Sequence, residues 1–314
     1  MAEVKKIATR DSYGKALAGL GAEHDDIIVF DADLSDSTRT GMFRRAFPER
    51  HFNCGIAEGN MMAAAAGAAA MGLVPFASSF VMFAVCRAFE QVRNSIGYPQ
   101  LNVKIGASHG GISVGEDGAT HQCCEDIALM RSIPGMVVMS PSDGVEAYAM
   151  VRAAYEHNGP VYMRFGRSPV PVIHDEANFS FKIGKGETLR GGDDVAIIAN
   201  GLMVYEALEA ARALAGAGIS ARVINIATVK PLDEELVLSA ARDCGRIVTC
   251  EEHSVIGGLG EAVCSLVSEK LPTPVRRIGI NDEFGVSGPA SALLKKFGLC
   301  ADNIVEVTKA FCGK

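Results

Sequence analysis

The sequence predicts an α/β protein made of two layered domains. Short apolar strand-like segments alternate with helical segments through the first half of the 314 residues, as in a parallel sheet covered by helices. A Pro- and Gly-rich stretch ending at residue 192 interrupts this alternation, which then restarts. Hydrophobic residues make up 48% of the chain and charged residues 21%, which indicates a folded chain rather than disorder. We therefore expect two three-layer α/β/α domains.

The first predicted domain, residues 1–170, begins with an amphipathic helix over 11–23. Its apolar runs are of strand length and are separated by segments of helical pattern, so we expect a mainly parallel sheet. The expected strands are 27–30, 73–76, 101–105, 136–139 and 161–164. The other expected helices are 60–71, 81–96, 125–131 and 144–157.

Residues 171–192 are predicted to be a linker, because prolines and then Gly-rich, charged sequence replace the periodic pattern. A smaller second domain, residues 193–314, follows. Its expected strands are 195–199, 221–226 and 246–250, and its expected helices are 203–215 and one that begins at Asp233.

Charge and cysteine content narrow the classes of partner and compartment. The net charge is −7 and no block of basic residues occurs, so neither nucleic acid nor an anionic membrane is an expected partner. Nine irregularly spaced cysteines and no signal-like N-terminal segment predict a reducing cytoplasm. Residues 61–86 lack charge and are long enough to span a bilayer, but Pro75 and the small residues favour a buried helix followed by a strand.

One carboxylate stands out at the start of the Ala-rich helix. Glu58 follows Gly55, Ile56 and Ala57, so it lies among small and apolar residues. A structural interpretation is an acid that interacts with the helix dipole. A functional interpretation is a buried acid that shares a proton with a basic ligand atom.

A second group of ionisable residues lies in the turn-rich segment 115–122. It places Asp117 four residues before His121, with His109 just upstream. An Asp and two His could orient a polyol and transfer protons, whereas the structural alternative is a turn with a satisfied histidine. A zinc site at His121, Cys123 and Cys124 is disfavoured, because adjacent cysteines rarely bind one tetrahedral ion.

In their order along the chain, these segments resemble the transketolase and deoxyxylulose-phosphate synthase family of thiamine-diphosphate enzymes. The similar segments are Gly-Ile-Ala-Glu at 55–58, Asp-Gly-x-Thr-His-Gln at 117–122, Ile-Pro at 133–134, Ser-Pro-Ser-Asp at 140–143, Glu-Glu-His at 251–253 and Gly-Gly-Leu-Gly-Glu at 257–261. The resemblance implies a thiamine-diphosphate pyrimidine-binding domain followed by a smaller transketolase C-terminal domain.

The resemblance assigns cofactor contacts to four side chains. Glu58 matches the acid that contacts the aminopyrimidine ring nitrogen and activates the cofactor through a shared proton. Phe80 and Phe83 match the aromatic pair on the pyrimidine, with Phe83 expected to stack directly. Asp33 resembles a residue of the loop near the thiazolium ring. Cys86 stands where the family often has a tyrosine.

The resemblance also assigns substrate contacts. Asp117 and His121 match residues that bind sugar hydroxyls beside the reacting carbon, and they join Glu58 and His109 as the expected catalytic group. His109 and Arg164 match residues that face the substrate phosphate, a role for which a guanidinium fork is well shaped. The loop position of Ser37 implies a contact with the phosphate end.

Half of the family's cofactor site has no counterpart in this sequence. The family holds the diphosphate and its Mg²⁺ (or Ca²⁺) on another domain, through a Gly-Asp-Gly motif and a later asparagine. Because no such arrangement occurs, we expect no metal ligands here, and we expect a partner subunit that carries the diphosphate-binding domain. The resemblance implies a heterotetramer with homodimerisation of this chain.

The glycines at 257–260 are a weak nucleotide-binding signal, and they suit close helix packing equally well.

The implied activity is transfer of a two-carbon ketol unit from a ketose phosphate to an aldose or aldose phosphate, as one subunit of a split transketolase. Two alternatives remain within the enzyme class: a 1-deoxyxylulose-5-phosphate-synthase-like activity and an oxo-acid dehydrogenase beta-subunit activity. A third is a non-catalytic assembly or regulatory partner of the same fold.

Overall fold

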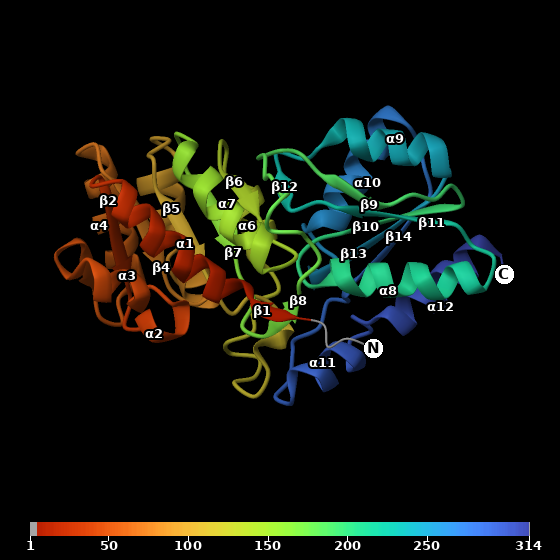
Figure 1. Ribbon diagram of the computed structural model, residues 1–314, viewed down its shortest axis with the longest axis horizontal. Helices are drawn as coiled ribbons and strands as arrows, with labels where there is room; N and C mark the ends of the chain where they lie inside the picture. Colours follow the sequence, from red (N-terminus) through yellow and green to blue (C-terminus); the bar gives the residue numbers. More distant parts are fainter. Residues whose placement is uncertain (1–4, 314) are drawn as a thin grey trace.

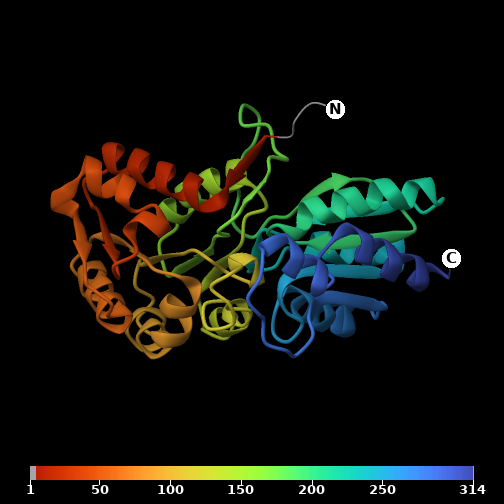
Figure 2. The ribbon, with the colours of Figure 1, turned by 90° about the horizontal axis from the view of Figure 1, so that it is seen from below.

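The computed structural model describes residues 5–313, which form two lobes side by side (Figures 1 and 2). The outer limits of the two predicted domains, residues 1 and 314, lie outside this range. Each lobe contains one large sheet with helices on both faces, so the predicted α/β class with two layered domains is confirmed.

The sheet of the first lobe has the strand order β12-β6-β7-β5-β4-β2-β3, and its strands pair in parallel apart from β12. These strands are β2 (Ile27–Asp31), β3 (His51–Asn53), β4 (Val74–Ser78), β5 (Lys104–Ala107), β6 (Val137–Met139) and β7 (Val161–Arg164). One face is covered by α1 (Thr9–Glu23), α3 (Gly41–Ala46) and α7 (Gly144–Glu156), and the other by α4 (Glu58–Ala70) and α6 (Asp126–Arg131). Buried apolar side chains on both faces explain the three layers.

The second lobe has a five-stranded sheet in the order β14-β13-β10-β11-β9. Its strands are β9 (Glu187–Arg190), β10 (Val195–Ala199), β11 (Ala221–Asn225), β13 (Ile247–Ser254) and β14 (Val275–Ile280). Its helices are α8 (Met203–Gly216), α9 (Glu234–Cys244), α10 (Leu259–Lys270), α11 (Ala290–Lys296) and α12 (Ala301–Cys312). Side chains of α9 and α10 share one continuous buried cluster with the first lobe, so the lobes are joined by apolar packing.

Two strands were not predicted from local sequence, and one of them joins the two lobes. β9 lies inside the stretch expected to be a linker and pairs antiparallel with β11. β12 (Thr228–Lys230) leaves the second lobe and pairs antiparallel with β6, between the lobes in Figure 1. β12 thereby covers a strand that would otherwise be an exposed edge of the first sheet.

The segment expected to form one helix over 81–96 is irregular. It consists of a π-helical turn, η2 (Met82–Arg87), the short α5 (Phe89–Gln91) and a second π-helical turn, η3 (Val92–Gly97). π-helical turns occur often at functional sites, because the wider turn changes the direction of its side chains. The uncharged stretch 61–86 is divided between α4, β4 and η2, and within residues 5–313 no helix has both the length and the apolar character that a bilayer crossing needs.

Candidate active site

The predicted site residues gather at the carboxyl ends of the parallel strands of the first sheet. Asp33 follows β2, Phe80 follows β4 and His109 follows β5. Parallel α/β sheets bind their ligands at this edge, because the loops after the strands meet there. Topology therefore brings together residues that are far apart in the sequence.

Glu58 is the first residue of α4 and is only 1% exposed. Its two carboxylate oxygens accept hydrogen bonds from Nη1 of Arg87, at 3.1 and 2.9 Å. Arg87 also lies over the Phe83 ring, 4.5 Å from its centre, while 52% of its side chain stays exposed. The buried acid is thus balanced by a cation that has solvent on its other side.

Arg87 was not among the predicted site residues. It reaches Glu58 because the η2 turn carries it back across the start of α4, and a separation of 29 residues leaves no local pattern that could reveal the contact.

Aromatic rings form one wall of the site. The Phe80 ring centre lies 3.9 Å from that of His109 and 5.9 Å from that of Phe83. His121 meets Phe83 edge to face at 5.4 Å. The structure therefore brings the predicted aromatic pair and the predicted histidine pair into a single cluster, next to Glu58 through Arg87.

His109 is buried and has a left-handed backbone conformation, with φ of 64°. Its Nε2 lies 3.4 Å from Nη1 of Arg10, and its Nδ1 lies 2.8 Å from Oγ of Ser108. Because a guanidinium can only donate, Nε2 must accept and Nδ1 must carry the proton toward Ser108. Burial first, and then the nearby charges of Arg10, Arg167 and Arg39, lower the pKa of His109 to about 3.

We expect the His109 imidazole to stay neutral between pH 5 and pH 8. An unfolded chain would bind this proton below about pH 6.5, so the folded protein binds fewer protons from there down to about pH 3, and stability is lost as the pH falls through that window. Histidine ¹³C NMR against a His109→Asn variant should identify a non-titrating ring. A signal that titrates near pH 6.5 and is missing from the variant would contradict this expectation.

Three arginines surround His109, and none of them was predicted as a site residue. Arg10 donates to the carbonyl oxygen of Ser37 at 2.9 Å, so the structure brings the predicted Ser37 to this cluster. Arg39 is paired with Asp11 at 2.6 Å, and Arg167 donates to the carbonyl oxygen of Val114 at 2.6 Å. These arginines come from α1 and from two connecting segments elsewhere in the chain, so only the tertiary structure brings them near His109.

The two predicted acids other than Glu58 are exposed. The backbone N–H of Asp33 donates to side-chain oxygens of Asp31 and Asn53, both at 3.0 Å, which holds its left-handed turn with φ of 63°. Asp117 lies between Gly115 and Gly118, which both have positive φ. Both carboxylates therefore remain accessible to a ligand.

Arg164 is the last residue of β7 and so lies at the same edge of the sheet, but its guanidinium is engaged by other side chains. Its side chain is 6% exposed, and its guanidinium is paired with Asp126 at 2.9 Å and with Glu252 of the second lobe at 3.9 Å. Nη2 of Arg164 also donates to the Glu252 carbonyl oxygen at 2.8 Å. A buried guanidinium that is already paired with two carboxylates is poorly placed to bind a phosphate. The structure therefore corrects the phosphate-binding role expected of Arg164, whose side chain joins the two lobes.

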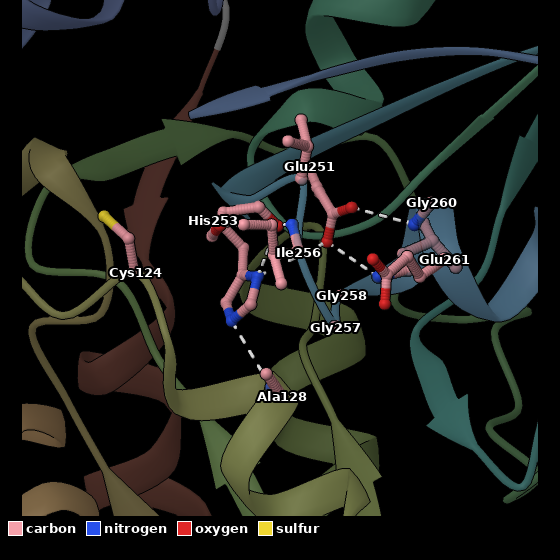
Figure 3. Close-up of polar contacts among 12 residues, drawn as sticks. Cys124, Ala128, Glu251, His253, Ile256, Gly257, Gly258, Gly260 and Glu261 are labelled. Carbon is pink, nitrogen blue, oxygen red and sulfur yellow. Dashed lines mark hydrogen bonds and ion pairs between the residues drawn. The ribbon is translucent and has the colours of Figure 1, made fainter. Parts of the chain in front are cut away.

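The glycine-rich segment 257–260 does not form an open phosphate-binding site. Figure 3 shows that the carboxylate of Glu251 lies at the start of α10, where it accepts the N–H groups of Leu259 and Gly260 at 2.7 and 2.8 Å. Nε2 of His253, which like Glu251 belongs to β13, lies 3.4 Å from the backbone nitrogen of Ala128 in the first lobe. The position that a nucleotide phosphate would need is filled by the chain's own acid.

A Gly258→Ala substitution should destabilise the second lobe by about 1–3 kcal/mol, the usual cost of overpacking. A Cβ atom there would lie 2.0 Å from Oε2 of Glu251 and 2.8 Å from Nδ1 of His253. The comparison is Gly216→Ala, where a Cβ would meet nothing within 4 Å. Urea unfolding measures both variants, and equal midpoints for the two would contradict the prediction.

Within residues 5–313, no group of three or more His, Cys, Asp or Glu side chains is arranged to hold a metal ion. The Cys123 sulfur, part of the disfavoured zinc alternative, instead lies 3.6 Å from that of Cys86.

Comparisons with known proteins identify both halves of the chain. Residues 5–172 match the family model "Transketolase, pyrimidine binding domain", and residues 184–304 match "Transketolase, C-terminal domain". The chain is 50% identical to a putative transketolase C-terminal section of Methanocaldococcus jannaschii, over 95% of this chain and 94% of that protein. It is 46% identical to a 6-deoxy-6-sulfo-D-fructose transketolase subunit of a Clostridium species, over 95% and 92%.

Other similarities extend to structures and to a related enzyme. A solved structure described as "Split gene transketolase, inactive beta4 tetramer" has a TM-score of 0.89 and 50% identity, and the match covers 98% of each chain. The chain is also 41% identical to a 1-deoxy-D-xylulose-5-phosphate synthase of Geobacter sulfurreducens, of whose length it covers 47%. Because its two domains, sequence and fold all agree, this chain belongs to the transketolase family.

Proposed function

We propose that the chain is the pyrimidine-binding subunit of a split, thiamine-diphosphate-dependent transketolase that transfers a two-carbon ketol unit from a ketose phosphate to an aldose or aldose phosphate. The observation that carries this proposal is the buried acid Glu58, whose partner Arg87 lies over the ring of Phe83, at the carboxyl edge of a parallel sheet. A buried carboxylate beside an aromatic face suits a flat, basic heteroaromatic ring.

The described residues fit the pyrimidine half of thiamine diphosphate. Glu58 would hold a proton at the pyrimidine ring and Phe83 would pack on its face, while Arg87 must move aside to free the carboxylate. The half-exposed side chain of Arg87 can do so without unpacking the core. When bound, thiamine diphosphate supplies a nucleophilic carbon and holds the electron pair released when the sugar's carbon–carbon bond breaks.

The substrate would lie against the histidine cluster. His109, neutral at physiological pH, offers Nε2 as a hydrogen-bond acceptor once Arg10 turns toward a ligand. Nδ1 of His121 is held by Oγ of Thr120 at 3.0 Å, which orients its ring next to Phe83. Together with the exposed Asp117, these groups would bind hydroxyls and move protons beside the reacting carbon.

Arg10 is our candidate for binding the substrate phosphate, in place of the buried Arg164. Arg10→Ala should raise the KM for a phosphorylated sugar about 10- to 100-fold, since one charge-assisted hydrogen bond contributes about 1.5–3 kcal/mol. The KM for an unphosphorylated acceptor should change little. Lys15→Ala, which removes an exposed cation from the same helix, is the control. Equal effects of Arg10→Ala on both acceptors would refute the assignment.

A partner chain is proposed because the chain offers an uncharged surface beside its half-site. Asn60, Ala63, Gly67 and Ala70 are exposed along one face of α4. Ile56, just before Glu58, is 76% exposed. A neutral surface of small and apolar residues next to a cofactor site favours a protein interface over contact with water.

The proposed partner is an N-terminal transketolase subunit that supplies the diphosphate-binding domain and holds Mg²⁺ or Ca²⁺, in a heterotetramer in which this chain also dimerises. The similar structure described as "Split gene transketolase, inactive beta4 tetramer" supports an assembly that needs a second kind of chain for activity. A cytoplasmic location suits nine free thiols, which persist in a reducing compartment.

The test is co-purification with the subunit encoded beside it, followed by a ketol-transfer assay with thiamine diphosphate and magnesium. We expect no turnover from either chain alone and turnover from the pair. Activity of this chain by itself would overturn the split-site proposal.

The similarity to a 1-deoxyxylulose-5-phosphate synthase supports one alternative activity for the same site. An assay of the reconstituted pair with pyruvate and glyceraldehyde 3-phosphate distinguishes the synthase activity from ketol transfer. Release of carbon dioxide with formation of a deoxyketose phosphate, and no transfer from ketose phosphates, would favour the synthase.

A further inference from the structure

We propose that Cys86 and Cys123 form a reversible redox modification site, at which a hydroperoxide converts the two thiols to a disulfide and lowers the activity of the neighbouring site. The effect on activity rests on the function proposed above, whereas formation of the disulfide does not.

The two sulfurs come from different parts of the first lobe. Cys86 belongs to the η2 turn and is half-buried, while Cys123 is fully buried in the segment after His121. Their Sγ atoms lie 3.6 Å apart, and a disulfide needs about 2.05 Å. Formation of the bond therefore requires the two sulfurs to approach by about 1.6 Å.

The local environment divides the roles of the two cysteines. Cys86 is partly exposed whereas Cys123 is fully buried, so peroxide reaches Cys86 first. Hydrogen bonding with Cys123 also lowers the pKa of the Cys86 thiol. The same contact, together with burial, raises the pKa of Cys123 far above its ordinary value. Cys86 is therefore the attacking thiolate and Cys123 the resolving thiol.

The chemistry balances with hydrogen peroxide as the oxidant. The Cys86 thiolate attacks one peroxide oxygen, which forms an S–O bond, breaks the O–O bond and releases hydroxide. The Cys123 sulfur then attacks the Cys86 sulfur, forms the S–S bond and releases water. Two thiols lose two electrons and two protons, and the peroxide is reduced to two molecules of water.

The bond would connect two sides of the candidate active site. Cys86 precedes Arg87, the partner of Glu58, and it shares the η2 turn with Phe83. Cys123 lies two residues after His121, whose ring contacts Phe83 at 5.4 Å. A disulfide would draw these segments together by more than 1 Å. The resulting shift of Phe83, Arg87 and His121 should reduce kcat about 100-fold.

The experiment treats the reconstituted complex with hydrogen peroxide and then with dithiothreitol. We expect fragmentation mass spectrometry to find a Cys86–Cys123 crosslink, with a loss of two titratable thiols, and kcat to fall about 100-fold and recover on reduction. Cys123→Ala, in which the resolving thiol is absent from a buried position, should form no crosslink and keep its activity under mild peroxide. Cys264→Ala, which removes a half-buried thiol on α10, should respond as the wild type does.

The outcomes separate the two proposals. Failure of the crosslink to form while other cysteines become oxidised overturns the redox site, and a crosslink that leaves kcat unchanged overturns its effect on activity. If Cys123→Ala folds poorly, the crosslink and its reversal in the wild type still decide the matter. A crosslink in a complex without ketol transfer in its reduced state supports the modification site and counts against the proposed function.

Discussion

Replacing Glu58 by Gln is expected to lower ketol transfer by the reconstituted complex about 1,000-fold or more. The amide keeps the size of the side chain and can still accept a hydrogen bond from Arg87, but it cannot share a proton with a basic ring nitrogen. Positioned proton transfer contributes about 10²- to 10⁴-fold to catalysis, and here it would be needed to activate the cofactor itself. The loss should appear in kcat, with the chain still folded and assembled with its partner.

The matched control for this experiment is Glu90→Gln, which changes an exposed acid on α5, three residues after Arg87. It should leave kcat within about twofold of the wild type, since an exposed acid away from the reacting atoms does not stabilise the transition state. If the Glu58→Gln complex turns over as fast as this control, Glu58 has no catalytic role and the proposed function fails with it.

Replacing Asp126 by Ala is expected to destabilise the chain by about 3–5 kcal/mol, because it leaves Arg164 buried without its nearest partner. Asp126 is fully buried, and its Oδ2 accepts from Nε of Arg164 at 2.9 Å and from the Tyr162 hydroxyl at 2.7 Å. Burial alone would lower the pKa of Arg164, but Asp126 and Glu252 raise it, so the guanidinium keeps its charge. The variant must therefore hold an under-compensated cation in its interior.

Urea unfolding of the isolated chain, followed by circular dichroism, measures this loss. Arg152→Ala is the control, because it breaks an ion pair with Glu23 in which both side chains are substantially exposed, and its unfolding midpoint should stay close to the wild-type value. Equal midpoints for Asp126→Ala and Arg152→Ala would show that the Arg164 cluster contributes nothing to joining the lobes.

Regular elements with a clear period were predictable. The helices over 144–157 and 203–215 and the strands over 27–30 and 195–199 were expected close to their observed positions, since local spacing of apolar residues determines which face can be buried. The irregular η2 and η3 turns were not predicted, because a π-helical turn shares the apolar spacing of an α-helix and depends on packing for its extra residue.

For the site, the sequence identified Glu58, Phe80, Phe83, His109 and His121 as candidates, and the structure brings these residues together. The functions assigned to them remain predictions. The sequence did not reveal Arg10 beside His109 or Arg87 beside Glu58, because both contacts join residues that are distant in the chain.

The sequence by itself determined the α/β class, the two layered domains and the family, since these depend on local periodicity and on short segments in a fixed order. Only the tertiary structure decided which charges are free to act. Arg164 keeps its charge but is paired with Asp126 and Glu252. Glu251 occupies the start of α10, and Arg10 lies beside His109. The physical reason is that the strength of a charge depends on its burial and on its partners, and both are set by the packing of segments that are remote in the chain.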